Sequence, residues 1–209
     1  AVLECTPGTP ADVSPANTGY PTVVIDSVTY EITEGANSVC NITASYSDQV
    51  IPKCGVGFRI IRTWTVLDWC LPVDFIDNPW PCTQVTPYND TTAPQFPPPA
   101  NMTVTANLPG CRARPVIPAM NITDCSSYTV AIFTPVGAFS GNGGQIPQPG
   151  LPFGLHTITV KATDACGNST SHTFTINVTD NTKPNAVCDQ FTVVALDDYG
   201  YAFAYATTF

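Results

Sequence analysis

The sequence has little charge and few basic side chains. Only 11% of its 209 residues are charged, with 7 Lys and Arg against 16 Asp and Glu, which gives a formal net charge of −9. Such a chain lacks the clustered cations that bind nucleic acid phosphates or anionic membrane surfaces. It also lacks an apolar run of about 18 residues, so we expect no membrane insertion.

Candidate catalytic residues are scarce as well. The only histidines are His156 and His172, no G-x-S-x-G motif is present, and the glycine-rich run 141–144 lacks the lysine of a phosphate-binding loop. Catalysis needs convergent groups with tuned pKa values, and the acids are scattered, although a paired-carboxylate site stays open. The nine cysteines contain no C-x-x-C pair, which disfavours zinc. We therefore expect neither an enzyme nor a bound cofactor.

The chain is rich in β-type composition. Hydrophobic residues make up 44% of it, and 21 Pro and 14 Gly separate short runs of Val, Ile, Thr, Tyr and Phe. No amphipathic helical window exceeds a couple of turns, so the predicted class is all-β. The strongest predicted strand is 58–67, with Ile60, Trp64 and Val66 on one face together with Arg62. We expect Arg62 to lie near the strand end with its head in water.

A repeat divides the chain. FRIIRTWTVLDWC at 58–70 and LHTITVKATDACGNSTS at 155–171 each place Asp, one residue and Cys after a β-type run. A tag, DTTAP or DNTKP, follows each run, and the offsets between equivalent aspartates are similar (164 − 68 = 96 and 180 − 90 = 90). We predict module one at 1–90 with an irregular N-terminal segment, module two at 91–184, and the first β-hairpin of a further module at 185–209.

The last of these segments should not be stable by itself. Two apolar runs, FTVVAL and YAFAYATTF, flank a predicted turn at 197–200. An isolated hairpin is marginally stable in water and leaves its edges open. We expect downstream chain or a neighbouring subunit to complete it by strand pairing. The pairing residues would be Phe191, Val193, Ala195, Tyr201, Phe203 and Tyr205.

The cysteines follow the repeat. Nine cysteines, few charges and many threonines favour an exported, oxidised chain, and the absence of a signal peptide fits a processed chain or a segment of a longer one. Cys40 to Cys54 and Cys111 to Cys125 both span 14 residues, which suggests equivalent positions. Loops at one end of a sandwich lie close together, which predicts two disulfides of about 2–4 kcal/mol each. These are Cys54–Cys70 and Cys125–Cys166.

The remaining cysteines suggest links between modules. We predict Cys111–Cys188 as a bridge across a module junction, and Cys40–Cys82 as the remaining pair. Cys5 would then bond to a preceding module or a neighbouring subunit. Because connectivity cannot be deduced from sequence, the alternative is that all pairs are local and one thiol is free.

Residues 154–184, GLHTITVKATDACGNSTSHTFTINVTDNTKP, resemble the end of a hyalin-repeat (HYR) module. RIIRTWTVLDWC followed by DTTAP, and KPNAVCDQFTVVAL, resemble the tandem modules of large secreted surface proteins of Bacteroidetes. The resemblance implies tandem immunoglobulin-like antiparallel β-sandwiches with disulfides, located extracellularly or at the cell surface. It implies a structural role in a fibre, filament or adhesin, with copies of itself or adjacent modules of the same long chain as partners.

Aspartates suggest a structural calcium site. Carboxylate and carbonyl oxygens at a module junction suit calcium, and the candidates are Asp90, Asp164, Asp180 and Asp189. The simpler interpretation is that Asp68 and Asp164 only bond the amides of their own turns.

Glycans enter in two ways. Asn41, Asn89, Asn101, Asn121, Asn168 and Asn177 head N-x-S/T triplets that would carry glycans in a eukaryotic host. The resemblance instead implies export-linked O-glycosylation at Ser27 and Thr91. Exposed aromatics could also bind glycans, which makes a glycan- or protein-binding adhesion module the alternative function, although Trp64 fits a core better. The aromatics considered are Trp64, Trp69, Trp80 and Tyr88.

Overall fold

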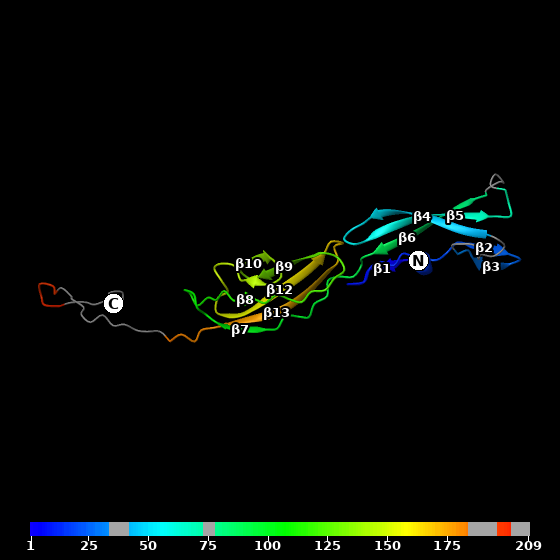
Figure 1. The fold of residues 1–209 in the computed structure, drawn as a ribbon. Coiled ribbons are helices and arrows are strands. Elements are labelled where there is room, and N and C mark those ends of the chain that lie inside the picture. The colour runs from blue at the N-terminus through cyan, green and yellow to red at the C-terminus, as the bar shows by residue number, and fades with distance from the viewer. Residues whose placement is uncertain (34–41, 73–77, 184–195, 202–209) are drawn as a thin grey trace. The chain divides into compact units, whose positions relative to one another are not determined.

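The computed structural model describes residues 1–33, 42–72, 78–183 and 196–201. Contacts divide the chain into two units, 1–179 and 180–209. The described part of the first unit is almost entirely β, with one short helix, α1 (Pro15–Thr18) (Figure 1). Among the described residues no helix has the length and apolar character needed to cross a membrane.

The first sheet has the strand order β1-β6-β5-β4. Its strands are β1 (Leu3–Glu4), β4 (Ile42–Pro52), β5 (Phe58–Asp68) and β6 (Trp80–Asn89). The edge strand β1 runs parallel to β6, and the other pairs are antiparallel. A separate hairpin of β2 (Thr22–Ile25) and β3 (Val28–Glu31) precedes β4 in the chain. A small core forms on the sheet around Trp64, which is 1% exposed.

The second sheet has the order β10-β9-β12-β13-β7, and β11 pairs separately with β8. The strands are β7 (Met102–Thr105), β8 (Val116–Ile117), β9 (Tyr128–Thr134), β10 (Gly137–Ser140), β11 (Gly144–Gln145), β12 (Gly154–Asp164) and β13 (Ser169–Thr179). Ile132 and Ile158 of the large sheet share one buried cluster with Ile117 of β8 and with Ile146. The two sheets therefore enclose an apolar core between them, as in a sandwich.

The same strand order occurs twice in the first unit. The orders β1-β6-β5-β4 and β7-β13-β12-β9 both begin with a short edge strand parallel to the last strand, followed by antiparallel pairs. On β12, Ile158, Val160 and Ala162 are fully buried, because alternate side chains of a strand lie on the same face. The predicted class is confirmed in that the described residues form mainly antiparallel β-sheets with disulfides. The boundaries at residues 90 and 184 stay predictions.

The second unit is described at 180–183 and 196–201. The carboxylate of Asp197 accepts hydrogen bonds from the backbone N–H groups of Tyr199 (2.9 Å) and Tyr201 (2.8 Å), which closes the predicted turn. Tyr201 is exposed. The other residues expected to pair in a hairpin, Phe191, Val193, Ala195, Phe203 and Tyr205, lie outside the described residues.

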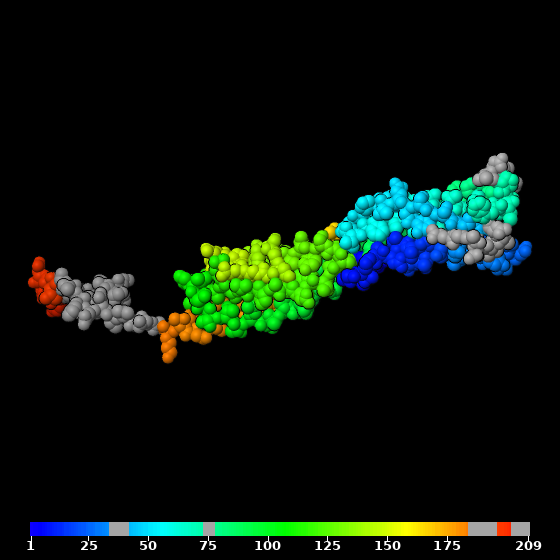
Figure 2. Space-filling view, viewed as in Figure 1, coloured from blue at the N-terminus to red at the C-terminus, as the bar shows by residue number. Residues whose placement is uncertain are grey.

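Arg62 occupies an unexpected place. It lies in the middle of β5 and is 2% exposed, so the expectation that its head reaches water is wrong. Its guanidinium bonds both carboxylate oxygens of Asp48 (2.8 and 2.9 Å), the Thr18 hydroxyl (2.8 Å) and the Val13 carbonyl (2.7 Å), and stacks 4.1 Å from the Tyr46 ring. The N-terminal segment covers the charge because it supplies two of these acceptors, the Thr18 hydroxyl and the Val13 carbonyl, and Figure 2 shows this segment, in blue, against the cyan residues of the first sheet.

Arg62→Met should destabilise the chain strongly, whereas Arg59→Met should not. Losing the buried cation leaves Asp48 without its partner and the N-terminal segment without its anchor, which costs about 3–5 kcal/mol. Arg59 lies exposed on the same strand, where substitutions cost within about 0.5 kcal/mol. Urea unfolding followed by tryptophan fluorescence measures both, and equal effects would contradict the anchoring role.

Candidate functional site

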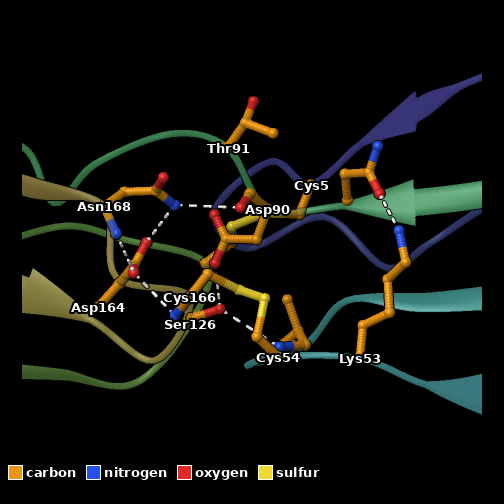
Figure 3. Close-up of a disulfide and its surroundings, with 12 residues drawn as sticks. Cys5, Lys53, Cys54, Asp90, Thr91, Ser126, Asp164, Cys166 and Asn168 are labelled. Carbon is orange, nitrogen blue, oxygen red and sulfur yellow. Dashed lines mark hydrogen bonds between the residues drawn. A yellow bond between two sulfur atoms is a disulfide. The ribbon is translucent and has the colours of Figure 1, made fainter.

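Two disulfides join the two sandwiches. Cys5 bonds to Cys125 with a Cα–Cα distance of 6.2 Å, and Cys54 bonds to Cys166 with a Cα–Cα distance of 4.9 Å. Cys5 follows β1 and Cys54 lies between β4 and β5, whereas Cys125 precedes β9 and Cys166 follows β12. Each bond therefore connects a residue before position 90 to one after it. We call this region, drawn around Asp90 in Figure 3, the junction.

These bonds correct three of the sequence predictions. Cys54–Cys70 is wrong because the two residues flank opposite ends of β5, an 11-residue strand that spans about 36 Å. Cys125–Cys166 is also wrong. The two residues do lie at the same end of the second sandwich, as the pairing of Asp164 with Tyr128 shows. Cys125 and Cys166 each bond instead to a cysteine of the first sandwich.

Cys5 is the third correction, because its partner is Cys125 of this chain and not a cysteine of a preceding module or a neighbouring subunit. The predicted Cys111–Cys188 and Cys40–Cys82 pairs each include a cysteine outside the described residues, so both stay predictions. Cys82 itself is exposed on β6 and forms no disulfide with a described cysteine.

Ser126 is the polar centre of the junction and is 6% exposed. Its Oγ accepts a hydrogen bond from the Val56 N–H (3.2 Å) and donates a short one to Asp90 Oδ2. The side-chain amide of Asn168 donates to the Asp90 carbonyl (3.0 Å) and to Asp164 Oδ2 (2.8 Å) (Figure 3). Polar bonds thus join the β4–β5 turn, the segment after β6, the segment before β9 and the β12–β13 turn, and a disulfide also joins the first and the last of these.

Three carboxylates meet at the junction. One oxygen each of Asp90, Asp124 and Asp164 lies within 4.8 Å of the others, and Asp90 and Asp164 are 5% and 6% exposed. Burial raises the pKa of Asp124, and the negative charges of Asp90 and Asp164 raise this pKa further. Oxygen atoms in this arrangement could hold a hard cation.

The sequence predicted two of these three aspartates, Asp90 and Asp164, as calcium ligands. Asp180 bonds the N–H of Thr182 (2.9 Å) in the second unit, and Asp189 lies outside the described residues. Asp124 was missed, although it stands beside Cys125, which the sequence had already placed near Cys166 and hence near Asp164.

The remaining residues that the sequence proposed for glycan binding or glycosylation do not form one site. Trp64 is in the core, Tyr88 is 7% exposed and stacks on Phe58 (4.9 Å), and Trp69 is 69% exposed. These aromatics therefore do not share one open surface for a glycan. Ser27, at the turn of the β2–β3 hairpin, and Thr91 are exposed, and their modification stays a proposal.

No family model matches the chain, and no curated protein matches it. Similar solved structures include mouse Cadherin-23 EC22-24 (18% identity, TM-score 0.35, covering 70% of this chain and 55% of that chain). Drosophila N-cadherin EC1-4 is 12% identical, with a TM-score of 0.35, covering 85% and 47%. The human Desmocollin-1 ectodomain is 12% identical, with a TM-score of 0.34, covering 85% and 38%. The chain thus spans about half the length of such structures or less, and this likeness carries no argument on function.

Gly55→Ala should disrupt the junction more than Gly8→Ala does. Both glycines have positive φ (+56° and +75°), so alanine strains the backbone at either position. A methyl group at Gly55 would lie 2.2 Å from Ser126 Oγ, whereas at Gly8 it would meet no atom within 4 Å. We expect Gly55→Ala to cost about 1–3 kcal/mol more. Urea unfolding of the two variants measures the difference, and equal losses would show that Gly55 does not contact Ser126 closely.

Proposed function

We propose that the chain is a load-bearing segment of an extracellular fibre or adhesin-like surface protein. The observation that supports this most is the pair of disulfides between the predicted modules 1–90 and 91–184. Disulfides form and persist in oxidising, extracellular settings. A module that only had to fold would place its cross-links within one sandwich, whereas cross-links between sandwiches resist their separation.

The cross-links shorten the covalent path along which tension runs. Without them, a force applied at the two ends passes through all residues from 5 to 166 (166 − 5 = 161). With the Cys5–Cys125 bond the path continues from 125 to 166 (166 − 125 = 41), and the Cys54–Cys166 bond offers a parallel path of 49 residues (54 − 5 = 49). Unfolding under load can therefore release only a small part of the chain.

Further modules of the same chain, or further copies of it, would extend the fibre beyond these two modules. In this proposal residues 185–209 begin a third module that downstream chain or a neighbouring subunit completes by strand pairing, as the sequence suggests. The partners are thus adjacent modules or copies of the same protein, and the mechanism is resistance to extension.

Single-molecule stretching of the oxidised chain between terminal handles tests this function. At about 3.5 Å per extended residue, unfolding between residues 5 and 166 should release at most about 140 Å in the wild type. The double variant Cys5→Ser/Cys54→Ser lacks both bonds and should release about 560 Å from the same segment.

Cys82→Ser is the matched control, because this exposed cysteine takes no part in the junction bonds, and it should stretch like the wild type. If the double variant also extends like the wild type, the junction bonds do not carry the load, and the proposed function is wrong.

A further inference from the structure

Negative charge accumulates at the junction without a basic partner. Asp90 follows β6 of the first sandwich, whereas Asp124 and Asp164 belong to the second. Among the described residues the ion pair is Arg62–Asp48, and no ion pair involves the three junction aspartates. Three carboxylate oxygens within 4.8 Å repel one another, and burial weakens the screening by water. The arrangement therefore favours a positive charge between them.

A second observation points to the same place. Asp90 is 5% exposed, and its Oδ1 is buried with no hydrogen-bond partner in the described structure. A buried carboxylate oxygen without a partner is costly, more so when the group is charged. The other oxygen of Asp90, Oδ2, accepts a hydrogen bond from the Ser126 hydroxyl. Both oxygens of Asp164 also have donors: Oδ1 accepts from the backbone N–H groups of Cys166 and Asn168, and Oδ2 accepts from the side-chain amide of Asn168. Asp90 thus has one carboxylate oxygen without a partner, and its carboxylate lies beside those of Asp124 and Asp164.

We propose that Asp90, Asp124 and Asp164 bind a calcium ion that bridges the two sandwiches. Calcium takes six to eight oxygen ligands at about 2.3–2.6 Å in flexible geometry, so opposite ligands can stand about 4.8 Å apart. Magnesium demands shorter bonds and a regular octahedron, which an irregular set from three loops suits less well. The nearby sulfurs of Cys5 and Cys125 form a disulfide, so they offer no thiolate to zinc.

A shared proton is the competing explanation for the same cluster. Carboxylates that share a site can hold one proton between them, which would also relieve the repulsion. The two explanations differ in what stabilises the junction: calcium acts at neutral pH, whereas a proton acts only in acid. A calcium ion would also add a non-covalent bridge beside the two disulfides.

The test is isothermal titration of calcium into the full, oxidised chain at pH 7 after EGTA treatment and desalting. We expect one saturable site with a Kd of about 10⁻⁴–10⁻³ M, as in extracellular modules, and binding of magnesium at least about tenfold weaker. Asp124→Asn should weaken calcium binding at least about tenfold, because it removes one carboxylate ligand. Asp12→Asn, at an exposed residue outside the cluster, is the matched control and should bind like the wild type.

Asp90→Asn tests the role of the Asp90 carboxylate directly, and circular dichroism shows whether it still folds. Asp124 is only partly buried, so its variant keeps the test valid if Asp90→Asn does not fold. The proposal is wrong if calcium shows no saturable binding, or if Asp124→Asn binds as tightly as the wild type. It is also wrong if acid raises the melting temperature while calcium at pH 7 does not, which would assign the cluster to a shared proton. None of these outcomes depends on the stretching experiment.

Discussion

The bond between Cys54 and Cys166, with its companion between Cys5 and Cys125, is the constraint on which the junction depends. The bonds close loops of 112 and 120 residues, and the chain-entropy model assigns about 4.7 kcal/mol to a loop of this length. The hydrogen bonds around Ser126 contribute about 1 kcal/mol each, and they form readily only because sulfur already holds the loops together. The covalent links therefore place the loops, and the polar contacts set how closely Gly55 and Ser126 meet.

The two sandwiches achieve their stability by different means. The second has an extended apolar cluster built from both of its sheets, in which Ile132, Ile158 and Ile176 are fully buried. Among the described residues the first has a smaller cluster around Trp64, and it buries Arg62 beneath the N-terminal segment. A buried ion pair is weak support by itself, because desolvation offsets much of its attraction. The stability of the first sandwich should therefore depend more on its contacts with the second sandwich, and the two disulfides hold these contacts in place.

Local patterns could be predicted from the sequence, and contacts between modules could not. Alternation along β5 predicted that Ile60, Trp64 and Val66 share one face, and all three are buried, because the side-chain period of a strand is two. The equal 14-residue spacings matched Cys54 with Cys125 in sequence, yet Cys54 follows β4 whereas Cys125 precedes β9, the strand in the equivalent place. Spacing along the chain does not show at which end of a strand a residue lies. The burial of Arg62 was not predicted for a related reason, since two of its acceptors, Thr18 and Val13, come from a segment more than forty residues away.

The acidic cluster follows from the same cross-links. Asp124 directly precedes Cys125, Asp164 lies two residues before Cys166, and the Cys5 N–H bonds the carbonyl of Asn89 (2.8 Å), the neighbour of Asp90. Bringing these cysteines together therefore brings the three carboxylates together. Disulfides alone would be served equally well by neutral side chains at these positions, which would avoid the repulsion and the unpaired Asp90 oxygen. Acidic residues destabilise the junction unless a positive charge offsets their repulsion. The same close placement of the three carboxylates provides oxygen ligands for a cation.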